Sequence, residues 1–258
     1  MEKRVLLKRY FGHSTFRNGQ EALIDAILSG RDVLGVMPTG GGKSICYQLP
    51  ALMLPGLTVV VSPLISLMKD QVAALSEVGI PAAFLNSSLT LEQLRAVYGR
   101  ASASAYRLLY VAPERLATES FLSLSRRVPI SLVAVDEAHC ISQWGQEFRP
   151  SYLKIADFIA SLPKRPVIAA FTATATQQVR ADIIEHLHLQ TPLCNITGFD
   201  RPNLYFDVQH PTSKLAATAA LIRAREGKSG IVYCATRAAV ERVCEFLAGF
   251  VLYSSRFQ

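Results

Sequence analysis

The sequence predicts an α/β fold in which helices cover both faces of a parallel β-sheet. Short apolar runs without strict alternation of polar and apolar residues recur along the chain, as is typical of strands buried on both faces. Segments with apolar residues at helical spacing lie between these runs, so each strand is expected to connect to the next through a helix. Polar motifs follow several of the runs, and ligands of parallel sheets bind beyond the carboxyl ends of the strands.

Several short apolar runs before residue 198 are expected to form the strands. They are rich in β-branched and other apolar side chains, which favour the extended conformation. They are the run that starts at Val33 and residues 57–61, 82–85, 108–111, 132–135, 167–171 and 193–197.

Helices are expected where apolar residues recur three or four positions apart. The clearest segments are residues 17–28, 45–52, 64–78, 91–101 and 177–187. Two of these segments are closed by Gly30 and Gly79, and glycine is the residue that most often follows a helix.

A domain boundary is expected near residues 198–203, where Pro202 and polar residues interrupt the alternation of strands and helices. The first domain would then cover residues 1–200 and the second residues 201–258. In the second domain we expect extended segments at 204–208 and 230–233 and helices at 215–225 and around 240–247. Because so short a segment buries too little surface for a secure sheet domain, we expect it to be truncated and to expose apolar surface beyond residue 204.

The composition indicates a globular chain with a basic surface. Hydrophobic residues make up 50% of the chain and charged residues 18%, which excludes a disordered protein. The net charge of +7 suits a polyanionic partner. The longest apolar stretches, such as residues 51–61, are too short and too interrupted to span a membrane, and no cleavable leader is recognisable, so we expect a cytoplasmic protein.

The cysteines indicate neither a zinc site nor a disulfide framework. The chain has 5 of them, widely spaced and without a C-x-x-C pair. Cys46, Cys140, Cys194, Cys234 and Cys244 are all expected to be small buried hydrophobic residues.

The segment after Val36 is expected to bind phosphate. It reads Met37-Pro38-Thr39-Gly40-Gly41-Gly42-Lys43-Ser44 and lies between an apolar run and a predicted helix. Its glycines let backbone N–H groups turn toward a polyphosphate, and the helix that follows adds its own unpaired N–H groups. Lys43 would pair with the β- and γ-phosphates, and Ser44 would bind Mg²⁺. Where the general pattern has a glycine, this chain has Met37.

Two adjacent carboxylates, Asp136 and Glu137, end the apolar run at 132–135. Neighbouring residues of a strand point to opposite sides of the backbone, so the two acids can hold different roles. Asp136 would hold Mg²⁺, and Glu137 would orient and deprotonate the attacking water. The alternative is that both acids are solvated loop charges.

The threonines of the segment Thr172-Ala173-Thr174-Ala175-Thr176 follow another apolar run. They either cap the helix that starts near Gln177 or relay the state of the γ-phosphate to a bound nucleic-acid strand. The residues alone do not favour one interpretation over the other.

The segment at 140–152 contains the only tryptophan of the chain, Trp144, close to Phe148, Arg149 and Tyr152. Aromatic side chains beside a basic residue suit stacking on unpaired bases. The alternative is a hydrophobic cluster that packs the loop against the protein.

Together these segments closely resemble the RecQ family of superfamily 2 DNA helicases. The match runs from about Leu7 to about Leu247. The segments that resemble its motifs are 11–20 (motif 0), 37–44 (I), 61–72 (Ia), 136–139 (II), 171–176 (III) and 230–234 (IV).

The resemblance implies a RecA-like P-loop NTPase motor domain followed by a truncated second RecA-like domain. It assigns adenine contacts to His13, Arg17 and Gln20, and catalysis to Lys43, Asp136 and Glu137. The implied phosphate site consists of Thr39, Gly40, Gly41, Gly42, Lys43 and Ser44, with Mg²⁺ on Ser44 and Asp136. The residues implied to couple DNA contact to hydrolysis are Ser142, Gln143, Trp144, Gln146, Phe148 and Arg149 in the aromatic-rich loop, and Thr172 and Thr174.

The implied activity is that of an ATP-dependent 3′ to 5′ DNA helicase in DNA repair and recombination, which acts on single-stranded and partially duplex DNA. The family's motifs V and VI, including an arginine that reaches the ATP site, should follow motif IV and are absent. We therefore expect this chain to bind ATP but to hydrolyse it weakly. Two alternatives stay open: a module that binds nucleotide and single-stranded DNA without unwinding, and an RNA-directed motor.

Overall fold

The computed structural model describes residues 2–145, 147–197, 204–225 and 227–249. The chain separates into two compact units, Met1–Asp200 and Arg201–Gln258. Gln146 and the expected boundary at 198–203 lie outside the described residues. The first unit contains all the other residues that the sequence assigns to the nucleotide site and the aromatic-rich loop.

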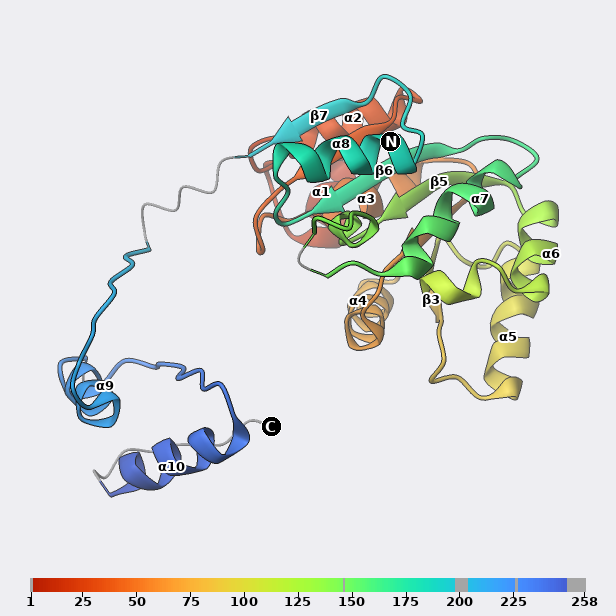
Figure 1. Ribbon diagram of the computed structural model, residues 1–258. Helices are drawn as coiled ribbons and strands as arrows, with labels where there is room; N and C mark the ends of the chain where they lie inside the picture. Colours follow the sequence, from red (N-terminus) through yellow and green to blue (C-terminus); the bar gives the residue numbers. More distant parts are fainter. Residues whose placement is uncertain (1, 146, 198–203, 226, 250–258) are drawn as a thin grey trace. The chain divides into compact units, whose positions relative to one another are not determined.

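The first unit is built on a seven-stranded sheet with the strand order β3-β4-β2-β5-β6-β1-β7 (Figure 1). All its neighbouring strands are parallel, which confirms the predicted fold class. Strand β6 lies between β1 and β5, so the segments that follow these three strands meet at one edge of the sheet. The strands are β1 (Val33–Val36), β2 (Leu57–Val61), β3 (Ala82–Leu85), β4 (Leu108–Val111), β5 (Ile130–Val135), β6 (Val167–Thr172) and β7 (Leu193–Ile196).

Helices cover both faces of this sheet, as the sequence predicts (Figure 1). One face carries α5 (Leu91–Ser102), α6 (Glu119–Arg127), α7 (Lys154–Ala160) and α8 (Gln177–His186). The other face carries α2 (Gln20–Leu28), α3 (Ile45–Met53) and α4 (Ile65–Glu77). Short 3₁₀ helices follow β4 and β5 and lie at the end of the aromatic-rich loop: η1 (Pro113–Arg115), η2 (Ala138–Ile141) and η3 (Pro150–Leu153).

Helix α1 (Lys3–Phe11) was not expected from the sequence. Only Leu6 and Leu7 are buried in it, so its apolar face is too narrow to give a clear periodic pattern. It packs on Ile24 of α2 and Leu49 of α3. None of the described helices is both long and apolar enough to cross a lipid bilayer.

Strand β1 illustrates how the sequence produces this packing. Leu34 and Val36 belong to the core on the α5–α8 face, whereas Val33 belongs to the core on the α2–α4 face. All three side chains are fully buried, and such burial contributes about 1.5–3 kcal/mol per large apolar side chain. Gly35 leaves room for Phe171 of β6, because a Cβ at position 35 would lie 2.7 Å from that ring. Strand β1 therefore lies tightly against its neighbour just before the phosphate loop begins.

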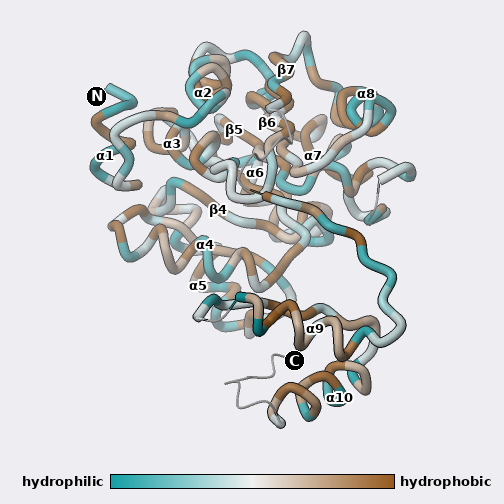
Figure 2. The backbone as a smooth tube through the Cα atoms, turned by 90° about the vertical axis from the view of Figure 1, so that its left-hand side faces the viewer, coloured by the Kyte–Doolittle hydropathy of each residue, from teal (hydrophilic) through white to brown (hydrophobic). Residues whose placement is uncertain are grey.

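The second unit contains α9 (Lys214–Arg223) and α10 (Arg237–Ala248), but its described residues form no strand. The prediction of extended strands at 204–208 and 230–233 is therefore wrong. A strand needs a neighbour for its backbone N–H and C=O groups, and neither segment pairs with another described segment. Tyr205 is 87% exposed and Ile231 is 80% exposed, and much of α9 is also apolar (Figure 2). Apolar surface beyond residue 204 is thus exposed, as predicted.

We expect chymotrypsin to cleave this chain first in the second unit. Proteases cut exposed segments that lack regular structure, and Tyr205, Phe206 and Tyr233 all lie in such segments, with Tyr233 90% exposed. Tyr110 in the first unit is buried within β4. Mass spectrometry at short digestion times should therefore show cleavage near residue 206 before any cleavage at Tyr110. Equal cleavage rates at Tyr110 and Tyr205 would contradict this prediction.

Candidate nucleotide site and aromatic-rich loop

The phosphate loop leaves β1 at the carboxyl edge of the sheet, as predicted. Gly40 and Gly42 adopt φ angles of 79° and 80°, which are accessible mainly to glycine. The N–H groups of Gly40, Gly42, Lys43 and Ser44 find no backbone acceptor among the described residues. Helix α3 starts directly after them, at Ile45. This arrangement leaves several donors and the positive end of a helix dipole for an anion.

Arg17 and Gln20 bind the backbone carbonyl oxygens of the phosphate loop. The buried amide of Gln20 donates to the carbonyl oxygens of Gly42 at 3.1 Å and Gly41 at 3.4 Å. Its Oε1 accepts a hydrogen bond from the Arg17 backbone N–H at 2.8 Å, while the Arg17 guanidinium donates to the Gly40 carbonyl. The structure therefore brings two of the three implied adenine contacts to the phosphate loop. No hydrogen bond joins the third, the exposed His13, to any described residue of this loop.

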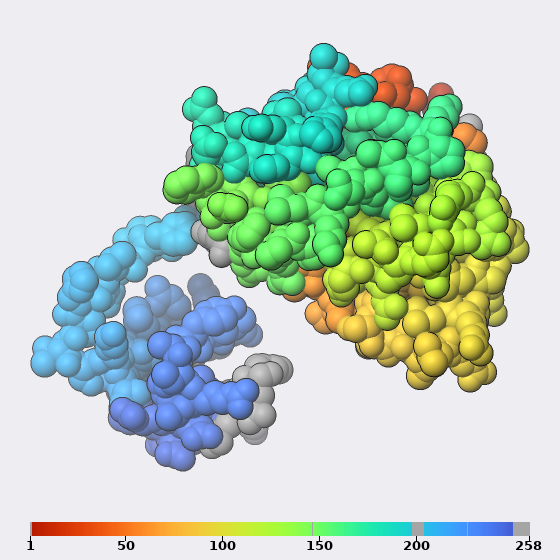
Figure 3. All heavy atoms as spheres, turned by 45° about the vertical axis from the view of Figure 1, so that its right-hand side comes forward, coloured from red at the N-terminus to blue at the C-terminus, as the bar shows by residue number. Residues whose placement is uncertain are grey.

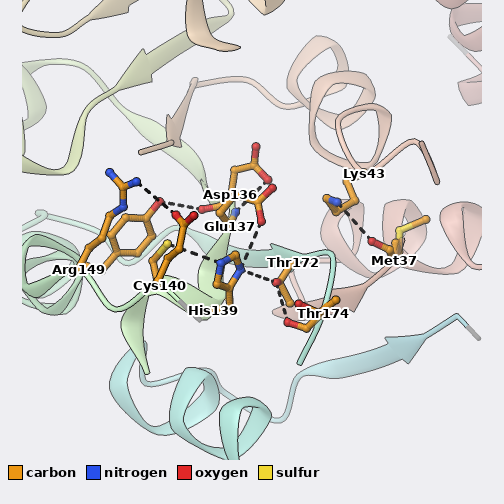
Figure 4. A network of polar contacts seen from close by, with 11 residues as sticks. Met37, Lys43, Asp136, Glu137, His139, Cys140, Arg149, Thr172 and Thr174 are labelled. Atoms are coloured by element: carbon orange, nitrogen blue, oxygen red, sulfur yellow. Dashed lines mark hydrogen bonds and ion pairs between the residues drawn. The ribbon is translucent and has the colours of Figure 1, made fainter. Parts of the chain in front are cut away.

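Lys43 provides a cation beside the two predicted carboxylates. Its Nζ lies 3.3 Å from the carbonyl oxygen of Met37, and within the described residues it forms no ion pair. Its positive charge favours the ionised form of both Asp136 and Glu137, although for Asp136 this effect is smaller than that of burial. Figure 4 shows Lys43 across from these two acids.

Asp136 and Glu137 occupy different environments, as expected for different roles. Asp136 is buried and accepts a hydrogen bond from the Glu137 N–H at 3.0 Å. Burial, followed by the charge of Glu137, raises the pKa of Asp136 to about 6. Glu137 accepts from His139, which lowers the pKa of the Glu137 carboxyl. Glu137 also has φ 46° and ψ 46°, a left-handed conformation that is costly for a residue with a Cβ and is found most often at functional sites.

His139 connects these acids to the threonine segment. The Thr172 hydroxyl donates its single proton to the Thr174 carbonyl at 3.1 Å, so it accepts from the Nδ1–H of His139 at 2.9 Å. The same Nδ1 lies 3.3 Å from Glu137 Oε2. Contacts with the thiol of Cys140 and the carboxylate of Glu137 raise the pKa of His139 to about 9. His139 therefore joins the segments that follow β5 and β6 through its contacts with Glu137 and Thr172.

One of the three threonines, Thr176, fits the capping interpretation. Thr176 caps α8, because its side chain accepts a hydrogen bond from the Val179 N–H. Thr172 is buried against His139, and its carbonyl accepts the N–H of Met37 at 3.0 Å. Thr174 is exposed and contributes its carbonyl oxygen.

The aromatic-rich loop, residues 140–152, is anchored at its ends and exposed in its middle. Trp144 is 77% exposed, so the alternative of a packed hydrophobic cluster does not hold for this residue. That interpretation fits Tyr152, which is fully buried and donates to the Asp136 carbonyl at 2.9 Å. The Arg149 guanidinium contacts Glu147 at 3.3 Å and the Pro63 carbonyl at 3.4 Å.

The remaining loop residues differ in exposure. Gln143 is exposed and Phe148 is half-buried, whereas Ser142 is fully buried beneath the loop and contacts Asp182 of α8. Sequence reasoning did not single out Asp182, since no motif marks a partner that lies 40 positions away.

The donor set fits Mg²⁺ and a polyphosphate. Mg²⁺ prefers oxygen ligands and usually takes one or two from the protein, with the rest from phosphate and water. Asp136, which has no ion-pair partner in the described structure, and the hydroxyl of Ser44 are such ligands. No group of three or more His, Cys, Asp or Glu side chains that could together hold a metal ion occurs among the described residues.

The cysteines agree only partly with the sequence prediction. Cys46 and Cys140 are buried, Cys234 and Cys244 are half-buried, and Cys194 is exposed. Burial of all five was therefore a wrong prediction. Cys194 lies in the edge strand β7, where alternate side chains face solvent.

Comparisons with known proteins agree with this geometry. Residues 17–182 match the family model described as DEAD/DEAH box helicase. The chain is 48% identical over 242 residues to the "ATP-dependent DNA helicase RecQ" of Haemophilus influenzae, covering 94% of this chain and 39% of that protein. It is 46% identical over 243 residues to the protein of the same name from Bacillus subtilis, covering 94% and 41%. The chain thus spans about two fifths of the length of these curated relatives.

Solved structures show the same fold at lower sequence identity. The crystal structure of the DUF1998 helicase MrfA superposes with a TM-score of 0.74 at 18% identity, covering 97% of this chain and 41% of that one. A hypothetical ATP-dependent RNA helicase from Sulfolobus tokodaii gives a TM-score of 0.57 at 20% identity, covering 94% and 71%. Because the family model spans the phosphate loop, both acids and the threonine segment, the chain belongs to the DEAD/DEAH box helicase family.

Proposed function

We propose that this chain forms the nucleotide-binding part of a RecQ-type, ATP-dependent DNA helicase. In the proposal, hydrolysis of Mg²⁺-bound ATP drives 3′ to 5′ movement along single-stranded DNA and the unwinding of partially duplex DNA in repair and recombination. The observation that supports it best is the meeting of Lys43, Asp136 and Glu137 at one edge of the sheet, with His139 joining them to the segment that exposes Trp144.

The site residues would divide the chemistry as follows. The free N–H groups of the phosphate loop and Lys43 would bind the phosphates. Ser44 and Asp136 would hold Mg²⁺, which supplies charge neutralisation at the phosphate oxygens when it is bound. Glu137 is ionised at neutral pH because its pKa is lowered, so it can orient a water molecule and accept its proton.

The same contacts offer a route from the nucleotide to the loop. Thr172 contacts the start of the phosphate loop through its carbonyl and His139 through its hydroxyl. A displacement of Glu137 during hydrolysis would move His139 and the residues that follow it. Trp144 is exposed at the middle of that segment, where it can stack on an unpaired base.

Two substitutions should separate the nucleotide site from the DNA contact. Lys43→Ala removes a charged hydrogen-bond donor and should weaken ATP binding roughly 10- to 100-fold, with little effect on binding of oligothymidylate. Trp144→Ala should have the converse effect, since one base stack contributes about 1–3 kcal/mol. A fluorescent ATP analogue and the anisotropy of a labelled oligonucleotide measure the two affinities, and the exposed Lys164→Ala is the control. Unchanged ATP affinity in Lys43→Ala would refute the proposed site.

Comparison of nucleic acids distinguishes the proposal from its alternatives. Oligothymidylate should stimulate ATP hydrolysis by this chain more than oligouridylate does. Stronger stimulation by oligouridylate would favour an RNA-directed motor. Stimulation without displacement of an annealed strand would favour a nucleotide- and DNA-binding module that does not unwind.

A further inference from the structure

Ser142 and Asp182 form a buried contact beneath the exposed Trp144. The Ser142 side chain is fully buried, and its Oγ donates to Asp182 Oδ2 at 2.5 Å. The same Oγ accepts the backbone N–H of Trp144 at 3.1 Å. Asp182 uses its other oxygen to accept the amide of Gln178 at 2.9 Å, one turn earlier in α8. Asp182 therefore fixes the direction of the one hydroxyl that holds the Trp144 backbone.

The direction of that hydroxyl matters because a serine side chain has a single proton. When Asp182 takes the proton, the lone pairs of Ser142 Oγ face the N–H of Trp144. Without Asp182 the buried Ser142 hydroxyl must find another acceptor, and the turn that contains Trp144 would have to rearrange. The Ser142 carbonyl also accepts the Gly145 N–H at 3.0 Å, so Ser142 organises both ends of this turn.

The turn is also packed closely onto the acid motif. A Cβ at Gly145 would lie 2.4 Å from the carbonyl oxygen of His139 and 3.1 Å from that of Ser142. The backbone on either side of Trp144 is thus confined, and little room exists for alternative positions that keep the Ser142 contacts.

Helix α8 is a rigid support for this contact. Val179 and Ile183 are buried in the core, and Thr176 caps the first turn of the helix. The helix contacts η2, which lies between the acid motif and the loop. In the space-filling view, α8 (teal) and the segment that contains the loop (green) form one continuous surface (Figure 3). The threonine segment is therefore connected to the aromatic-rich loop in two ways, through α8 and through the contact between Thr172 and His139.

We propose that Asp182 is a positioning residue that sets the Trp144 turn through Ser142 and links it to the threonine segment. Its effect on DNA binding rests on the proposed function, whereas its effect on the conformation of the loop does not. Asp182 touches neither the phosphate loop nor the two acids through any contact described for it, so it acts on the nucleotide site only through other residues.

Trp144 supplies the test, because it is the only tryptophan of the chain. Acrylamide quenching and anisotropy of its fluorescence in the free protein report the conformation of the loop. Asp182→Ala and Ser142→Ala should shift both signals alike, and the double variant should shift them no further, since the two residues act through one contact. Asp182→Asn should retain most of the wild-type signal because its amide oxygen can still accept the Ser142 proton. Glu185→Ala, an exposed acid on the same helix, is the matched control and should leave the signals unchanged.

Oligothymidylate binding then tests the consequence for DNA. Asp182→Ala should weaken this affinity about tenfold, the order expected when a hydrogen bond to a charged group is lost, while affinity for a fluorescent ATP analogue stays unchanged. The positioning role would be overturned if Trp144 quenching and anisotropy in Asp182→Ala equalled those of the wild type and of Glu185→Ala. If the wild-type chain failed to bind oligothymidylate, the proposed function would fall, and the quenching measurements would still decide the role of Asp182.

Discussion

Replacing Glu137 by glutamine is expected to lower kcat for ATP hydrolysis by about 10²- to 10⁴-fold, the range associated with loss of a general base. Glutamine has the same shape and can still accept the Nδ1–H of His139, so the local structure should persist. It cannot accept a proton from water. ATP affinity should stay close to that of the wild type, because Lys43 and the phosphate loop are unchanged.

Single-turnover hydrolysis with saturating oligothymidylate measures this loss, and a fluorescent ATP analogue measures affinity. Glu147→Gln is the matched control, since Glu147 lies on the same segment and contacts only Arg149 among the partners found for its side chain. Its kcat should be nearly unchanged. A Glu137→Gln variant that hydrolyses ATP at a rate close to the wild type would mean that another group activates the water.

The strands and the main site could be predicted from the sequence for one physical reason. Strands buried on both faces are mostly apolar, so β2 and β5 are recognisable without knowledge of their neighbours. The carboxyl ends of parallel strands share an edge, so Lys43 and Asp136 were expected to meet although they are far apart in the sequence. Their chemistry is encoded locally, in each short motif.

The rest of the structure depends on contacts that no local pattern encodes. The Ser142 contact with Asp182 joins an ordinary loop serine to an ordinary helical aspartate. Segments 204–208 and 230–233 have the composition of strands, yet they pair with no described segment and form no strand. A third example is Asp32, which precedes β1 and carries no recognisable motif.

Asp32→Ala is expected to lower the free energy of unfolding of the first unit by about 2–5 kcal/mol, because it removes a buried carboxylate that pairs with the partly exposed Arg165 and accepts two backbone N–H groups. Asp32 is 2% exposed and receives two hydrogen bonds from the Arg165 guanidinium, at 2.6 and 3.2 Å. Its carboxylate also accepts the backbone N–H groups of Ile168 at 2.9 Å and Gln190 at 2.7 Å. Removing it leaves a guanidinium and two backbone donors without their acceptor. Such a loss is a large part of the 5–15 kcal/mol that is typical of a domain.

Urea denaturation followed by Trp144 fluorescence measures this change, with Asp25→Ala as the control. Asp25 is an exposed partner of Lys3 on α2, and surface ion pairs contribute only about 0–1 kcal/mol. Asp32 lies at the amino end of β1, the end opposite to the phosphate loop. Under conditions where Asp32→Ala remains folded, its affinity for ATP should therefore match that of the wild type. If Asp32→Ala kept the full stability of the wild type, the two backbone donors and Arg165 would have found other acceptors. If it folded but bound ATP more weakly, the two edges of the sheet would be coupled through β1.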